Sequence, residues 1–132
     1  MPAPLFTREE ADAMLPQVAP LLWQAQRLKR DHDEAQQRLA GLEAKGRSNG
    51  HGLDAEISST RLAAQRAVTE VNAIIERVRA MGIEVKDLDL GLIDFRSQRD
   101  GREVYLCWKL GEESVLWWHE LDTGYASRQP LE

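Results

Sequence analysis

The sequence KGRSNGHGLD, from Lys45 to Asp54, separates two runs of regularly spaced apolar residues. It contains three glycines together with a serine and an asparagine, a composition that interrupts a helix and forms a loop. On both sides, apolar or small residues recur at intervals of three and four. The chain is therefore predicted to contain two long helices joined by a flexible loop near residues 45–53, with His51 in that loop.

The run after the loop predicts a helix that ends at Gly82. Asp54 is expected to cap its N-terminus, and Gly82 stands where a glycine commonly closes a helix. The alternating spacing is the heptad pattern of a helix that packs lengthwise on another helix. The seam consists of Ile57, Thr60, Ala64, Ala67, Val71, Ile74, Val78 and Met81.

The run before the loop predicts a helix that begins at Thr7, because Thr7 and Glu10 have the spacing of a capping box. Pro16 and Pro20 cannot donate backbone hydrogen bonds, so the helix either kinks there or ends near Leu15 and restarts at Pro16. The seam keeps its phase across the prolines, which favours a kink. Its members are Met14, Val18, Leu21, Ala25, Leu28, Ala35, Leu39 and Leu42.

One position of this seam is polar. His32, between Asp31 and Asp33, occupies the place of an apolar residue. It is either a buried pH switch or metal ligand, or a polar seam residue that fixes the register of the two helices. We favour the second interpretation, because Leu28 and Gln36, one turn away, provide no second ligand.

Residues 1–82 are thus expected to form a long antiparallel helical hairpin that resembles a coiled coil. Val68 and Ile75 widen the apolar stripe of the second helix beyond its seam. A wider stripe requires a third surface, which is either the C-terminal half or a second copy of the chain.

Residues 83–132 show the alternation of short strands, so we expect three or four antiparallel strands and a C-terminal tail. Asp100–Gly101 is a strong signal for a hairpin turn. A second hairpin is expected to turn at Glu112–Glu113, with Leu110 opposite Val115. Sheet and hairpin together are predicted to pack as one α+β domain.

This register assigns the side chains of the second hairpin to two faces. The face that points away from the core would combine Tyr105 and Trp118 with Lys109 and Glu120, a mixture typical of a binding surface. The core face would carry Val104, Leu106, Trp108, Leu110, Val115, Trp117, His119 and Leu121.

Several polar residues of the second half could form a site. Asp94, between Ile93 and Phe95, is expected to be partly buried and to need a partner, which Arg102 or Arg128 could supply. His119 is expected to be a hydrogen-bonded histidine of the core, and Cys107 a structural thiol. The candidate ligand-binding residues are Asp94, Arg102, Trp118, His119, Glu120 and Arg128.

Composition narrows the functional classes. With 17 basic and 22 acidic side chains, the net charge of −5 opposes nucleic-acid binding, and Arg96, Arg99 and Arg102 make only a weak basic patch. The chain has a single cysteine and no regularly spaced cysteines and histidines of the kind that bind zinc. We therefore expect no disulfide, no bound metal and no cofactor. Neither a secretory signal nor a membrane span is evident, so we expect a soluble cytoplasmic protein.

The blocks FTREEADAMLPQV, GLIDF, DGREVYLCWKLGE and WWHELDTGYASRQP resemble a family of small bacterial proteins catalogued as domain of unknown function 2203. The likeness extends over nearly the whole chain and implies a complete member of that family. It implies no activity, because the family is uncharacterised.

Two functions remain open on this evidence. The first is a non-enzymatic interaction module that forms a homodimer and could bind a protein partner through its helical hairpin. The alternative is a small-molecule- or metal-binding protein, or a small enzyme, with a polar pocket around Asp94, His119, Glu120 and Arg128. An open pocket at these residues would favour the alternative.

Overall fold

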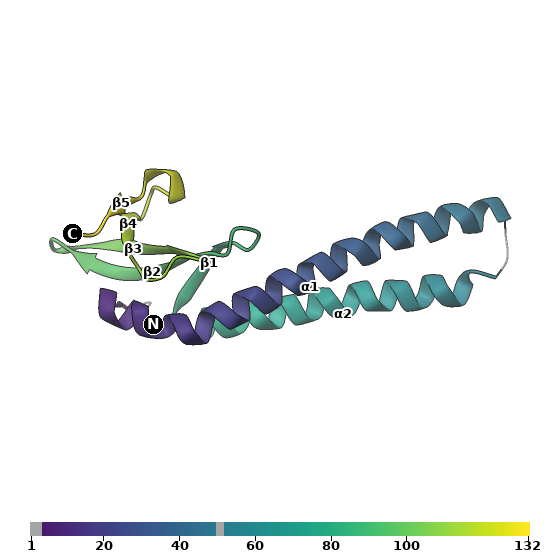
Figure 1. Ribbon diagram of the computed structural model, residues 1–132, viewed down its shortest axis with the longest axis horizontal. Helices are drawn as coiled ribbons and strands as arrows, with labels where there is room; N and C mark the ends of the chain where they lie inside the picture. Colours follow the sequence, from purple (N-terminus) through teal and green to yellow (C-terminus); the bar gives the residue numbers. More distant parts are fainter. Residues whose placement is uncertain (1–3, 50–51) are drawn as a thin grey trace.

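The computed structural model describes residues 4–49 and 52–132, and it confirms an α+β fold. Helices α1 (Arg8–Asn49) and α2 (Asp54–Ala80) pack side by side as a hairpin that extends well beyond the sheet (Figure 1). The strands are β1 (Ile83–Asp87), β2 (Leu92–Arg99), β3 (Arg102–Lys109), β4 (Trp117–Glu120) and β5 (Gln129–Pro130). A short 3-10 helix, η1 (Tyr125–Ser127), precedes β5.

Helix α1 begins where the sequence predicted. The backbone N–H of Thr7 donates to Glu10 Oε1 at 2.8 Å, and the N–H of Glu10 donates to Thr7 Oγ1 at 3.0 Å. Pro16 and Pro20 lie inside one continuous helix, so the helix does not end and restart at Pro16. Figure 1 shows α1 changing direction along its N-terminal part, which contains both prolines.

The helix ends near the loop differ from the prediction. Helix α1 continues through Lys45 to Asn49, because glycine at position 46 weakens a helix without forbidding it. Asp54 is the first residue of α2 rather than its cap, and Leu53 takes the cap position without a side-chain hydrogen bond. His51 lies outside the described residues.

Both heptad seams are confirmed by burial. Gly82, with a φ of 87°, closes α2 as predicted. The half-buried seam positions are Met14, Leu28, Ala35, Ile57, Val71 and Met81. The buried ones are Val18, Leu21, Ala25, Leu39 and Leu42 in α1, and Thr60, Ala64, Ala67, Ile74 and Val78 in α2.

The sheet is an antiparallel meander in the order β1-β2-β3-β4-β5. It has five strands rather than three or four, because the C-terminal tail adds the two-residue β5. One cluster of buried residues joins the sheet to the N-terminal part of α1 and the C-terminal part of α2. It includes Ala11, Leu15, Val18, Leu22, Ile74, Val78, Ile93, Phe95, Leu106, Trp108 and Trp118.

The turn at Asp100–Gly101 is confirmed, since both residues have positive φ and Arg99 pairs with Arg102 across it. The predicted register of β3 and β4 is wrong by one residue. Leu106 lies opposite Trp118 rather than His119. A shift of one residue exchanges the two faces of a strand.

The loop between β3 and β4 explains this shift. The chain turns at Leu110–Gly111 rather than at Glu112–Glu113, since the backbone N–H of Glu112 donates to the carbonyl of Lys109 at 3.0 Å. The indole N–H of Trp108 donates to the carbonyl of Glu112 at 3.0 Å. The backbone N–H of Val115 donates to Asp12 Oδ1 of α1 at 2.6 Å, which attaches the loop to the hairpin. Trp118 therefore packs in the core, whereas Trp117, His119 and Leu121 do not occupy the predicted core face.

Candidate functional site

Asp94, Cys107 and His119 form a buried polar cluster on the sheet face that points away from the core. Asp94 of β2 lies directly opposite Cys107 of β3, and His119 of β4 pairs with Tyr105, two residues before Cys107. Antiparallel pairing brings residues of three neighbouring strands into contact, so this cluster follows from the register. Asp94 and His119 each expose only 2% of their surface, and Cys107 exposes none.

The histidine of the polar cluster is held at both ring nitrogens. His119 Nδ1 lies 2.8 Å from the carbonyl oxygen of Glu120, and Nε2 lies 3.0 Å from Asp94 Oδ2. Because a carbonyl oxygen only accepts hydrogen bonds, Nδ1 carries a proton and donates it. The side of the ring that faces Asp94 is therefore fixed as Nε2.

Burial governs the ionisation of this cluster. It raises the pKa of Asp94 above its usual range, and the neighbouring His119 only partly opposes this effect. Burial, together with the negative charge of Asp94, raises the pKa of Cys107 to about 12. A thiol with this pKa is neutral at physiological pH.

A second group of residues covers the cluster from the C-terminal segment. The guanidinium of Arg128 stacks on Trp117 and Tyr125, with its Cζ atom 4.6 and 4.4 Å from the ring centroids. It also donates two hydrogen bonds to the carboxylate of Glu112, at 3.2 and 2.7 Å. Arg128 lowers the pKa of Cys107, although burial outweighs this effect. Arg128 thus connects the C-terminal segment to the β3–β4 loop.

The polar face continues toward β1. Burial would raise the pKa of Glu84, but hydrogen bonds from Lys86, Tyr105 and Arg96 outweigh it and hold the pKa below its usual range. The phenol of Tyr105 donates to Glu84 Oε1 at 2.9 Å. Tyr105 is itself 5% exposed, so it does not contribute to the open aromatic surface that the sequence predicted.

The sequence-predicted site residues separate into four groups, one of which is Arg128 with its partner Glu112. Asp94 and His119 meet in the polar cluster, and the partner of Asp94 is His119 rather than an arginine. Arg102 Nε donates to Glu120 Oε2 at 3.1 Å, in an ion pair between the first residue of β3 and the last residue of β4. Trp118 is only 7% exposed and faces the core.

Sequence reasoning missed two members of the site. The sequence interpretation considers Cys107 only as an isolated thiol and Glu112 only as a turn residue. The alternation of β2 and β3 could have placed Asp94 and Cys107 on one face, because both belong to long strands joined by a clear turn. The partnership of Glu112 with Arg128 depends on the conformation of the loop, which has no comparable signal.

The arginines of the weak basic patch are all neutralised. Arg96 forms ion pairs with Glu84 and Glu103, at 3.4 and 2.9 Å. The other two are paired with acidic residues near the C-terminus, namely Arg99 with Glu132 and Arg102 with Glu120. This pairing leaves little positive charge for phosphate groups.

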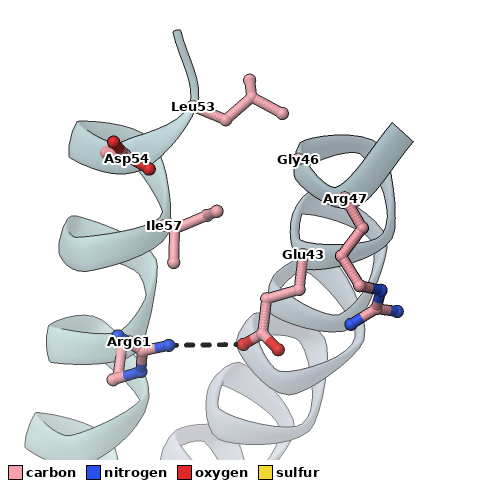
Figure 2. Close-up of a pocket in the computed structure, with 7 residues that line it drawn as sticks. All are labelled: Glu43, Gly46, Arg47, Leu53, Asp54, Ile57 and Arg61. Atoms are coloured by element: carbon pink, nitrogen blue, oxygen red, sulfur yellow. Dashed lines mark hydrogen bonds and ion pairs between the residues drawn. The ribbon is translucent and has the colours of Figure 1, made fainter. Parts of the chain in front are cut away.

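The surface of the helical hairpin has several open pockets. Figure 2 shows one of them near the tip, lined by Leu53 before α2, Ile57 of α2 and Gly46 of α1. Its volume is about 370 Å³. Arg61 Nη2 and Glu43 Oε1 face each other across it at 3.4 Å. His32, farther along, has its Nδ1 3.2 Å from Asp33 Oδ1 and its Nε2 3.4 Å from Gln36 Nε2.

These features describe an α+β protein in which a projecting helical hairpin carries a small sheet with a buried acid–thiol–imidazole cluster. The chain belongs to the family described as "Uncharacterized conserved protein (DUF2203)", whose model matches residues 4–131. No curated protein and no solved structure matches the chain. Over the residues described, neither helix has an apolar segment that could cross a membrane.

Proposed function

We propose that this protein is a non-enzymatic interaction module that forms a homodimer through its helical hairpin. The observation that carries the proposal is the projection of the hairpin beyond the sheet (Figure 1). Helix α1 has 42 residues and is about 60 Å long at a rise of about 1.5 Å per residue. Such an arm provides a surface far larger than the sheet requires for its own core.

The arm has a groove between its helices, on the side of α2 that bears Val68. The hairpin groove has a volume of about 430 Å³, and Val68 is 40% exposed at its edge. Small seam residues such as Ala64 contribute to this groove, because they do not fill the space between the helices. Its lining consists of His32, Gln36, Leu39, Arg61, Ala64, Gln65, Val68 and Thr69.

The charges of the groove favour a second copy of the chain as its occupant. Arg61 is the one basic side chain of this lining with a permanent charge, and Glu43 neutralises it. Two such grooves related by a twofold axis bring together apolar and amide side chains without like charges opposed. A strongly charged partner helix would leave its charges unpaired there.

The burial of the polar cluster supports the non-enzymatic part of the proposal. Asp94 and His119 expose 2% of their surface each, so a substrate cannot reach them as they stand. We also place the protein in the cytoplasm, where a reducing environment suits its single thiol, Cys107.

The test is the molar mass in solution, measured by sedimentation equilibrium over a wide concentration range. We expect a dimer for the wild type, and a monomer for Val68→Glu, because this change places an unpaired charge in the groove. Leu62→Glu is the matched control: Leu62 is an exposed apolar residue of the same helix, outside the groove lining, and its variant should remain dimeric. A wild type that stays monomeric at high concentration would overturn the homodimer.

A further inference from the structure

We propose that Asp94, Cys107 and His119 bind a zinc ion. Their candidate ligand atoms, a carboxylate oxygen, a thiol sulfur and an imidazole nitrogen, all lie within 4.8 Å of one another. Ligand atoms around a tetrahedral zinc ion are about 3.3–3.8 Å apart. Shifts of about an ångström in these side chains would therefore bring them to coordination distance. A mixed set of nitrogen, sulfur and oxygen donors suits zinc better than calcium or magnesium, which prefer oxygen alone.

The hydrogen bonding of His119 prepares it for this role. Its Nδ1 donates to the carbonyl oxygen of Glu120, which leaves Nε2 directed at Asp94 Oδ2, 3.0 Å away. Two acceptors at this distance repel each other unless a proton or a cation lies between them. A histidine that ligates a metal through one nitrogen commonly donates the other N–H to a carbonyl or carboxylate. The contact with Glu120 is such a bond.

The second carboxylate oxygen is an independent observation that points to a ligand. Asp94 Oδ1 is buried and has no hydrogen-bond partner, alone in this respect among the side chains that the structure describes. A buried carboxylate oxygen without a partner is costly, because it has lost its hydration and gained nothing in exchange. A bound cation would give this atom a partner, with Asp94 coordinating either through Oδ1 alone or through both carboxylate oxygens.

Charge balance also favours a divalent cation. With Asp94 and Cys107 ionised and His119 neutral, the three ligands carry two negative charges, which one zinc ion balances. Zinc binds the thiolate form of cysteine rather than the thiol. Zinc uptake would therefore release the thiol proton to solvent, together with any proton shared by Asp94 and His119. The guanidinium of Arg128 also acts on Cys107, but its positive charge is neutralised by Glu112.

The position of the cluster indicates what the ion would do. Its ligands belong to three neighbouring strands, β2, β3 and β4, and all are buried. Zinc would connect the short β4 to the two long strands and exclude substrate. With three protein ligands, the fourth position of a tetrahedral zinc ion would be taken by the second oxygen of Asp94 or by a water molecule. The site does not depend on the homodimer.

The experiment uses the full chain, stripped with a chelator and then titrated with Co²⁺ as a spectroscopic substitute for zinc. We expect one ion per chain and a near-ultraviolet thiolate-to-cobalt charge-transfer band that zinc abolishes. Zinc should also raise the melting temperature of the stripped protein. If cobalt binds without the thiolate band, or does not bind stoichiometrically, the proposal is wrong. The wild-type protein alone decides this, independently of any variant.

Variants then identify the ligands. Cys107→Ser should abolish the charge-transfer band, and His119→Gln should weaken zinc binding at least tenfold. His32→Gln is the matched control, because His32 lies on α1 with Asp33 and Gln36 as its neighbours. If His32→Gln weakens binding as much as His119→Gln, the ion is bound on the hairpin and the proposal is wrong.

Discussion

The contact between Asp94 and His119 should dominate the stability of the sheet when no metal is present. Both side chains expose 2% of their surface, and Nε2 of His119 is 3.0 Å from Oδ2 of Asp94. Replacing one partner of such a buried pair leaves the other buried and unpaired, which costs about 3–5 kcal/mol. At about 3–5 °C per kcal/mol for a chain of this size, His119→Leu or Asp94→Leu should lower the melting temperature by about 10–20 °C.

The double variant gives the sharper expectation. Replacing both partners by apolar residues leaves no buried polar group without a partner. The double variant should therefore lose less free energy of unfolding than either single variant. The free energy of unfolding is to be measured by guanidinium titration in the presence of a chelator, with His32→Leu as control, expected within about 1 kcal/mol of the wild type. Additive losses in the double variant would refute the reasoning, because they would mean that the two side chains act independently.

Three further outcomes test the fold. Glu84→Gln should destabilise the protein at pH 7 by less than about 1 kcal/mol, because Glu84 is partly exposed. Since folding lowers the pKa of Glu84, the difference in stability should vanish as the pH falls through the folded-state pKa. Denaturant titrations at pH 7 and pH 3 would show this. Gly91→Ala should cost about 1–3 kcal/mol, because Gly91 has a φ of 66° and an added Cβ would lie 2.4 Å from Leu110 Cβ. Gly41→Ala, on an open helix surface, should instead stabilise the protein by up to about 1 kcal/mol. Equal melting temperatures for the two variants would contradict this. Thr7→Ala should cost about 1 kcal/mol through loss of the capping box, and unchanged thermal unfolding would show that the first turn is held by other contacts.

The hairpin could be predicted from sequence because its determinants are local and repeated. Each heptad of α1 and α2 restates the same seam, so a single polar residue such as His32 does not change the phase. The capping box of Thr7 and the closing glycine at position 82 are likewise local signals, and both are confirmed. The cap at Asp54 was wrong because two adjacent positions could start the same helix, and only backbone conformation separates them.

The polar cluster could be predicted only in part, because it depends on one residue of register. The sequence identified Asp94 and His119 as members of a possible site, yet it placed His119 on the core face. The face of His119 is determined by the loop before β4, where Val115 donates to Asp12 and Glu112 binds Arg128. Such contacts between distant segments leave no periodic pattern, so they could not be derived from spacing.

The bond between Asp12 and Val115 has a consequence for the order of folding. These residues are 103 positions apart, whereas the outer part of the hairpin and the meander join residues that are closer in sequence. The outer part of the hairpin can form as soon as α2 has been synthesised, but the apolar residues of the first turns of α1 must wait for the last strands. During synthesis, the beginning of α1 would thus be the exposed apolar segment that a chaperone could recognise. Pulse-labelling hydrogen exchange during refolding would show it as the last part of α1 to gain protection.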